Sequence, residues 1–224
     1  MRVAVLVSGG KDSALALHRA LRSGFEVECL VVMVPRRKDS WMFHFPNVGL
    51  MELFAKAAGI PLVVGETEGV KEEEVEDLRC VLGGLDVEGV VCGAVASRYQ
   101  RSRVDRVCGE LGVVSVLPLW GEDGLRLLEE LVGLGFEVVV SRVGALGFGE
   151  EWLGRVIDGD AINALVGLNR RFGVSVVGEG GEYETLVLDA PFFRERRIDL
   201  VEVERVWERQ SGWLHVKKAR LVNK

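Results

Sequence analysis

The chain has 224 residues, of which 48% are hydrophobic and 28% charged, and its formal net charge is -6. A chain this long and this apolar can bury a core without disulfides or metals, and its mixed charges exclude intrinsic disorder. The acidic balance makes nucleic acid an unlikely main partner.

The first half of the chain alternates short apolar runs with amphipathic stretches, the pattern of strands buried on both faces and of the helices that connect them. Strands are predicted at 2–7, 26–33, 61–64, 88–92 and 113–117, and helices at 13–23, 48–58, 70–82 and 97–111. This alternation predicts a doubly wound parallel sheet, whose ligands bind at the carboxyl ends of the strands. The loops after Val7, Met33 and Cys92 should therefore share one edge of the sheet.

The second half has a different pattern. It predicts a helix near 125–134, a strand at 136–143, a helix near 160–172, and strands at 198–207 and 213–221. The last two strands are joined by Gln210-Ser211-Gly212, which is typical of an antiparallel hairpin. We therefore predict two closely packed domains, residues 1–120 and a smaller α+β lobe at 121–224. In the first domain, Glu72-Glu73-Glu74 is interpreted as a solvated helix face.

Four cysteines, Cys29, Cys80, Cys92 and Cys108, lie far apart and form no C-x-x-C pair. This spacing predicts neither a zinc site nor a disulfide framework, so we expect buried free thiols and a reducing compartment. The start of the chain lacks the pattern of a signal peptide, and no apolar run is long enough to cross a bilayer. We expect a cytoplasmic protein with no membrane partner.

The sharpest local signal is Ser8-Gly9-Gly10-Lys11-Asp12-Ser13, between the first predicted strand and the first helix. Two glycines let the backbone turn tightly and bring its N–H groups toward an anion, and the helix adds the positive end of its dipole. The spacing is neither that of a Walker A loop nor that of a dinucleotide fingerprint. The alternative is a glycine-rich turn in which Ser13 caps the helix.

This string resembles the PP-loop of the ATP pyrophosphatases, a family with a Rossmann-like fold. The family cleaves ATP between the α and β phosphates and releases AMP and pyrophosphate. The resemblance implies that residues 1–120 form an ATP-binding domain, and that ATP and Mg²⁺ are the cofactors. A carboxylate beside a bound triphosphate needs a cation between them, so Asp12 is the candidate metal ligand.

Three further strings resemble one branch of that family, the diphthine-ammonia ligases. They are Asp39-Ser40-Trp41-Met42-Phe43-His44 with Asn47, Gly93 to Gln100 with Arg103 and Arg106, and Gly178 to Pro191. Diphthine is a modified histidine of translation elongation factor 2, which carries a trimethylammonium group and a carboxylate. The branch converts that carboxylate to an amide with ATP and ammonium, so the resemblance implies this elongation factor as the partner.

The resemblance also indicates which residues bind each ligand. For the nucleotide they are Ser8, Gly9, Gly10, Lys11, Asp12, Ser13, His44 and Gly93. For the substrate they are Asn47, Tyr99, Gln100, Arg103, Glu179, Gly180, Gly181, Glu182, Tyr183 and Glu184. The candidate catalytic residues are Lys11, Asp12, Glu182 and Glu184.

Two groups of charges point to ligands by themselves. Glu179, Glu182 and Glu184 place three carboxylates within six residues, and such repulsion is tolerated where a cation binds or where raised pKa values serve chemistry. We hypothesise that the ring of Tyr183, together with Glu179 and either Glu182 or Glu184, holds the trimethylammonium group. Arg103 is placed to neutralise a phosphate or the substrate carboxylate. The simpler interpretations are a solvated acidic turn before a strand and a solvated cationic helix face.

The implied reaction is adenylation of the substrate carboxylate, followed by attack of ammonia on the acyl adenylate. Electrostatic stabilisation would supply most of the rate, and no protein nucleophile is required. Free ammonium is the expected nitrogen source, and homo-oligomerisation is left open. Two alternatives remain: a tRNA-modifying PP-loop enzyme, either a thiolase or a lysidine-type synthetase, and a non-catalytic sensor of adenine nucleotides. The acidic charge and the dispersed cysteines disfavour the first.

Overall fold

The computed structural model describes residues 1–35, 50–70 and 72–224. In the first half of the chain, strands and helices alternate as the apolar periodicity predicts. The elements are β1 (Arg2–Leu6), α1 (Lys11–Arg22), β2 (Glu26–Pro35), α2 (Met51–Ala58), β3 (Leu62–Thr67), α3 (Glu73–Gly83), β4 (Gly89–Val91), α4 (Arg98–Leu111) and β5 (Val114–Val116). Every strand boundary lies within three residues of its predicted position.

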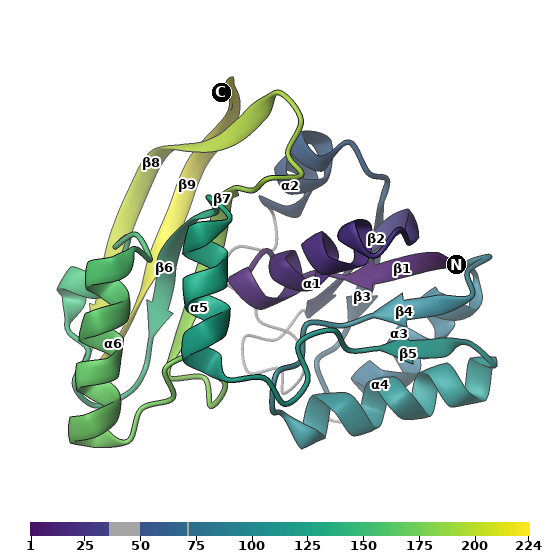
Figure 1. The fold of residues 1–224 in the computed structure, drawn as a ribbon, viewed down its shortest axis with the longest axis horizontal. Coiled ribbons are helices and arrows are strands. Elements are labelled where there is room, and N and C mark those ends of the chain that lie inside the picture. Colours follow the sequence, from purple (N-terminus) through teal and green to yellow (C-terminus); the bar gives the residue numbers. More distant parts are fainter. Residues whose placement is uncertain (36–49, 71) are drawn as a thin grey trace.

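These strands form one parallel sheet in the order β3-β2-β1-β4-β5, with helices on both of its faces (Figure 1). Successive side chains of a strand point to opposite faces. Val3 and Val5 accordingly belong to the core under α1 and α2, whereas Ala4 belongs to the core under α3 and α4. The predicted doubly wound sheet is confirmed.

The first helix begins two residues earlier than predicted. Its N-cap is Gly10, which has no side chain to cap the helix, and α1 starts at Lys11. Ser13 lies inside the helix, where its Oγ donates to the Gly10 carbonyl at 3.0 Å. The alternative in which Ser13 is the N-cap is therefore wrong.

In the second half, the predicted helices and hairpin are also present. The elements are α5 (Gly124–Gly133), β6 (Glu137–Val143), the short 3-10 helix η2 (Glu150–Trp152), α6 (Gly159–Phe172), β7 (Tyr183–Asp189), β8 (Arg196–Glu208) and β9 (Ser211–Asn223). The strands form an antiparallel sheet in the order β7-β6-β9-β8. In Figure 1, α5 and α6 lie in front of this second sheet.

One continuous core joins the two sheets. Apolar side chains of α1 and α2 share it with those of α5, β6 and β7. An aromatic cluster lies at the junction, where Phe54 of α2 meets Phe192 and Phe193, and Phe136 meets Phe192, at centroid distances of 5.1–6.0 Å. The loop between β7 and β8 is thus anchored on the first sheet's helices. The division at residue 120 stays a prediction.

Two sequence interpretations need correction. Cys29 and Cys108 are buried free thiols as expected, but Cys80 is exposed. Within the acidic run, Glu72 and Glu73 are exposed, but Glu74 is fully buried at the start of α3. Periodicity alone did not separate these positions, because each lies at the edge of an amphipathic face.

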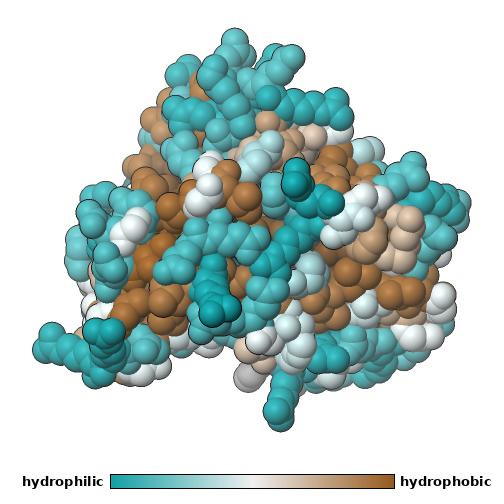
Figure 2. All heavy atoms as spheres, viewed as in Figure 1, coloured by the Kyte–Doolittle hydropathy of each residue, from teal (hydrophilic) through white to brown (hydrophobic). Residues whose placement is uncertain are grey.

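Figure 2 shows one face of the molecule, on which hydrophilic and apolar residues are interspersed. Among the described residues, no helix is both long and apolar enough to cross a membrane.

Candidate active site

A cavity of about 170 Å³ opens at the carboxyl ends of β1, β2 and β4. It is lined by Leu6, Val7, Ser8, Asp12, Ser13, Val31, Val32, Met33, Cys92, Gly93, Ala94, Gln100, Val104, Gly178 and Glu179. The segments after β1 and β4 therefore share one edge of the sheet, as the sequence predicts, whereas the loop after β2, residues 36–49, lies outside the described residues. The first cavity, as we call it, lies where the strand order changes direction around β1, the usual ligand position in open α/β sheets.

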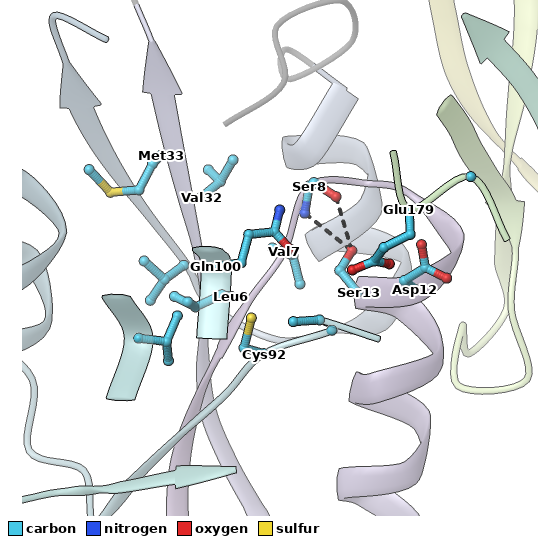
Figure 3. Close-up of a pocket in the computed structure, with 15 residues that line it drawn as sticks. Leu6, Val7, Ser8, Asp12, Ser13, Val32, Met33, Cys92, Gln100 and Glu179 are labelled. Atoms are coloured by element: carbon cyan, nitrogen blue, oxygen red, sulfur yellow. Dashed lines mark hydrogen bonds between the residues drawn. The ribbon is translucent and has the colours of Figure 1, made fainter. Parts of the chain in front are cut away.

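The first cavity has an apolar end and a polar end (Figure 3). Val32 and Met33 of β2 mark the apolar end, whereas Ser8, Asp12 and Glu179 mark the polar end. Such a division suits a ligand with an apolar part and a polar part.

The phosphate loop, residues 8–13, is held partly by its own side chains. The Ser13 Oγ accepts from the Ser8 N–H at 3.2 Å and lies 3.3 Å from the Ser8 Oγ (Figure 3). Gly9 has a φ of +81°, and a Cβ at this position would lie 3.0 Å from the Met51 Sδ. Both the backbone conformation and the space therefore require glycine here.

The same loop is also tied to the second sheet. The Gly9 carbonyl accepts from the Val187 N–H at 2.9 Å, and the Lys11 N–H donates to the Thr185 Oγ1 at 3.0 Å. Both partners lie on β7, whose residues 185 and 187 point to the same side because the side-chain period of a strand is two. The loop thus joins the two halves of the chain.

Lys11 is almost completely buried between the two halves, with 4% of its surface exposed. Its Nζ donates to the Asp12 carboxylate at 2.8 Å and to the Val177 carbonyl at 2.5 Å, and lies 5.2 Å from the centre of the Tyr183 ring. The ammonium is therefore bound by acceptors from both halves of the chain.

A second cavity of about 410 Å³ continues from the polar end of the first. The two cavities share Ser8, Asp12, Gln100, Gly178 and Glu179. The wall of the second cavity also includes Gly10, Lys11, Ser97, Tyr99, Ser141, Gly180, Gly181, Tyr183, Glu184, Thr185 and Leu186. Its volume is within the range of small-molecule sites, about 300–1,000 Å³. Most of the predicted substrate residues are thus brought together beside the phosphate loop.

The three predicted carboxylates have separate partners. Glu179 accepts from the Ala96 N–H at 2.9 Å and the Ser97 N–H at 2.6 Å, so it links the second half of the chain to the start of α4. Glu182 accepts from two backbone N–H groups within its own loop, at 2.9 and 2.8 Å. Glu184 pairs with Arg142 of β6 at 2.7 Å. These contacts offset the expected mutual repulsion without a bound cation.

Tyr183 is packed in the core rather than open to a ligand. Its side chain is 2% exposed, and its hydroxyl donates to the Val176 carbonyl at 2.7 Å. Burial raises the pKa of this hydroxyl well above its usual value, so it stays protonated. The structure does not show the open aromatic face that the trimethylammonium hypothesis assigned to Tyr183.

The start of α4 contributes to the second cavity, but Arg103 points elsewhere. Ser97 caps the helix by accepting from the Gln100 N–H at 3.3 Å. The Arg103 guanidinium donates to Glu72 and lies 3.5 Å from the centre of the Tyr99 ring. That hydrogen bond lowers the pKa of the Glu72 carboxyl. Among the described residues, Arg103 belongs to the lining of neither cavity.

Close packing explains why residue 93, in the wall of the first cavity, is a glycine. A Cβ at Gly93 would lie 2.7 Å from the Ser13 N and 2.8 Å from the Asp12 carbonyl. The second residue after β4 must therefore be glycine so that the chain can pass the start of α1. His44 and Asn47, together with the Asp39 to His44 string, lie outside the described residues.

Two residues that contact Lys11, Thr185 and Val177, were not among the site residues predicted from the sequence. The carbonyl of Val177 had no sequence signal, because any residue supplies a backbone oxygen. Thr185 had a weak one, since it lies within the Gly178 to Pro191 string.

A parallel sheet with an anion-binding loop after β1, and a cavity across the carboxyl ends of its strands, defines a nucleotide-binding α/β protein. Two family models match the chain: the diphthamide synthase N-terminal domain at residues 1–115 and the diphthamide synthase C-terminal domain at residues 123–222. The chain therefore belongs to the diphthamide synthase family.

Similar proteins carry a consistent name. The chain is 34% identical to diphthine–ammonia ligase of Rattus norvegicus and 33% identical to that of Homo sapiens, over 88% of this chain and 82% of each relative. It is 35% identical to diphthine–ammonia ligase of Schizosaccharomyces pombe over 95% of this chain, but spans only 38% of that protein. A crystal structure described as a predicted subunit of tRNA methyltransferase from Methanocaldococcus jannaschii aligns with a TM-score of 0.46 and 16% identity, covering 85% of this chain and 98% of that one.

Proposed function

We propose that this chain is a diphthine–ammonia ligase, which uses ATP and ammonium to convert the carboxylate of diphthine on translation elongation factor 2 to an amide. The observation that carries the proposal is the continuity of the two cavities. Their shared wall, which includes Ser8, Asp12 and Glu179, would place the phosphates of a nucleotide next to the substrate loop, residues 178–184.

The first cavity would take the nucleoside part of ATP. Its apolar end, at Val32 and Met33, suits an adenine ring, and its polar end continues into the phosphate loop. The loop meets the steric demands of a nucleotide because Gly9 and Gly10 leave the backbone free of side chains. Ser8, Lys11 and the N-terminus of α1 would hold the phosphates.

Asp12 is the residue that would hold Mg²⁺. Among the described residues, there is no group of three or more His, Cys, Asp or Glu side chains that could hold a metal ion by themselves. This fits Mg²⁺, which proteins commonly bind through one or two carboxylates together with substrate phosphates. When bound, the ion would neutralise charge on the phosphates.

The second cavity would take the diphthine side chain. Glu184 and the exposed part of Glu179 give its wall a negative charge, which suits the trimethylammonium group, whereas Lys11 lies at the phosphate side. Tyr183 is proposed to support Lys11 through its ring rather than to contact the substrate. The substrate carboxylate would then approach the α phosphate beside Lys11.

The residues near the reacting atoms favour electrostatic catalysis. The buried ammonium of Lys11 would stabilise the charge that develops as pyrophosphate leaves, and burial strengthens that effect. The thiol of Cys92, in the wall of the first cavity, has its pKa raised to about 11 by burial, so it stays protonated at neutral pH. A protonated thiol is a poor nucleophile, which disfavours a thiolase that transfers sulfur from this cysteine.

The test is to mix the chain with ATP, Mg²⁺, ammonium and elongation factor 2 that carries diphthine, and to measure AMP and the amide product. We expect one AMP for each amide, and neither product without ammonium and the modified factor beyond slow hydrolysis. Formation of ADP, or no turnover, would reject the proposal. Tightly bound nucleotide without AMP release would instead favour the nucleotide sensor.

A further inference from the structure

We propose that Thr185 is a positioning residue, which holds the phosphate loop at a fixed position relative to the substrate loop. Thr185 lies on β7 in the second sheet, directly after the acidic residues of the substrate loop. Its Oγ1 accepts the Lys11 N–H at 3.0 Å, across 174 residues of sequence. This inference rests on the proposed function, because it assigns the two loops to the two substrates of that reaction.

The hydrogen bond replaces a helix cap that the local sequence lacks. The first N–H groups of a helix have no partner within the helix, and a polar side chain at the N-cap usually supplies one. Here the N-cap is Gly10, which has no side chain. Thr185 supplies the missing acceptor from the other sheet, so capping of α1 depends on the second half of the chain being in place.

A second contact fixes the direction of the loop. The Val187 N–H donates to the Gly9 carbonyl at 2.9 Å. Thr185 thus contacts Lys11, and Val187 contacts Gly9, so two residues of β7 hold two positions of the phosphate loop. Two contacts of this kind prevent the loop from pivoting about either one.

The consequence for the reaction is geometric. Transfer to the α phosphate requires the attacking oxygen to lie about 3–3.5 Å from phosphorus, and an error of about 1 Å can cost about 100-fold in rate. Pyrophosphate would be held by the phosphate loop, and diphthine by the loop that leads into β7. Thr185 connects these two parts by a single side-chain hydrogen bond, whereas the Val187 contact is made by backbone and survives any side-chain change.

The chain offers a closely matched control. Its other threonine, Thr67, is buried where Thr185 is only partly buried, and its Oγ1 likewise accepts a backbone N–H, from Gly69 at 3.2 Å. Thr67 lines neither cavity within the described residues. Thr185→Val and Thr67→Val therefore each remove one such hydroxyl at nearly constant volume, and Thr185→Ser keeps the hydroxyl.

The first measurement does not depend on the reaction. Amide hydrogen exchange of the peptide that covers residues 8–13 is followed in the whole chain without ligand. Relative to the protein without substitutions, we expect exchange to be at least about tenfold faster in Thr185→Val. The rate in Thr185→Ser should be close to that of the unsubstituted protein, and the rate in Thr67→Val should equal it. Exchange in Thr185→Val within twofold of the unchanged protein would overturn the proposal.

The second measurement is turnover of the same four proteins. For Thr185→Val we expect kcat for AMP formation to fall about 10-fold to 100-fold, with KM for ATP changed less than about threefold. Thr185→Ser should recover most of kcat. The positioning role would be overturned if Thr185→Ser and Thr185→Val lost kcat equally, or if Thr185→Val exchanged faster with an unchanged kcat.

Failure of the proposed function is separable from failure of this inference. If the unchanged chain forms no AMP, the function is rejected, and loop exchange together with binding of α,β-methylene ATP still decides the role of Thr185. In that case, unchanged affinity and exchange in Thr185→Val overturn the inference, and weakened affinity with faster exchange supports it. If Thr185→Val does not fold, Thr185→Ala is measured in its place against Thr185→Ser.

Discussion

The phosphate loop and the substrate loop are held in shape by different kinds of contact. The phosphate loop is glycine-rich and uses its backbone, so its shape depends on short contacts such as Ser8 to Ser13 and on support from β7. The substrate loop is acidic and uses its side chains, since Glu182 accepts from two of its own backbone N–H groups. A motif rich in charge can therefore be structural, whereas a motif poor in side chains can be the anion site.

The largest expected effect comes from the one buried cation of the phosphate loop. Lys11→Met keeps most of the apolar stem but removes the ammonium that would stabilise the leaving pyrophosphate. We expect kcat for AMP formation to fall about 10²-fold to 10³-fold. Lys56→Met, at an exposed position of α2, is the control and should leave kcat unchanged. A loss of less than tenfold in Lys11→Met would mean that the backbone of the loop suffices.

The next comparison separates backbone conformation from crowding in the phosphate loop. Gly9 and Gly24 have nearly the same φ, +81° and +77°, but a Cβ would meet Met51 at Gly9 and nothing within 4 Å at Gly24. Gly24→Ala should lose about 1–2 kcal/mol of unfolding free energy from the left-handed conformation alone. Gly9→Ala should lose more and should also weaken ATP binding. If denaturant unfolding showed equal losses of unfolding free energy for the two variants, crowding by Met51 would not explain why residue 9 is glycine.

The acidic loop offers a contrast between two carboxylates that accept backbone N–H groups in different ways. Glu182 uses both carboxylate oxygens to accept backbone N–H groups, whereas Glu179 uses only its Oε1 for both of its contacts. An amide side chain has one acceptor oxygen and cannot replace both. Glu182→Gln should therefore cost about 1.5–3 kcal/mol of unfolding free energy, and Glu179→Gln less than about 1 kcal/mol.

Urea unfolding of both variants checks this contrast. The same proteins serve to measure KM for the diphthine substrate. If Glu182 held the trimethylammonium group instead of its own loop, Glu182→Gln would raise KM for the diphthine substrate and leave stability unchanged. That result would return Glu182 to a binding role.

The smallest expected effect is a pH dependence at the junction between the sheets. His18 on α1 packs 5.8 Å from the ring of Phe136, and burial, aided by Arg22, lowers the pKa of its imidazole below 6.5. The unfolded chain therefore takes up the proton first, so the contribution of neutral His18 is complete above about pH 6.5 and is lost as the pH falls. His18→Gln should flatten the pH dependence of the melting temperature between about pH 7 and 5. Replacement of the exposed His215 should leave it unchanged.

Much of the fold could be predicted from the sequence because its signals are local. Strand and helix periodicity placed every strand of the first sheet within three residues, and the Ser8 to Ser13 string lies at the predicted turn from the first strand into the first helix. The errors fell where burial depends on a distant neighbour. Glu74 is buried and Cys80 exposed, although both lie on the same helix and were assigned by pattern alone.

The sequence by itself determined the alternating α/β pattern, the glycine turn after β1 and the chemical types at the site, since these follow from residues close together in the chain. Only the tertiary structure decided how the charges are used. Glu179 is bound to the start of α4, Arg103 is turned to Glu72, and Lys11 is enclosed between the sheets. Thr185 is likewise defined by a distant partner, since its Oγ1 accepts the N–H of Lys11. The physical reason is that each of these side chains is paired with a group far away in sequence, and a local pattern carries no information about which distant donor or acceptor it will meet.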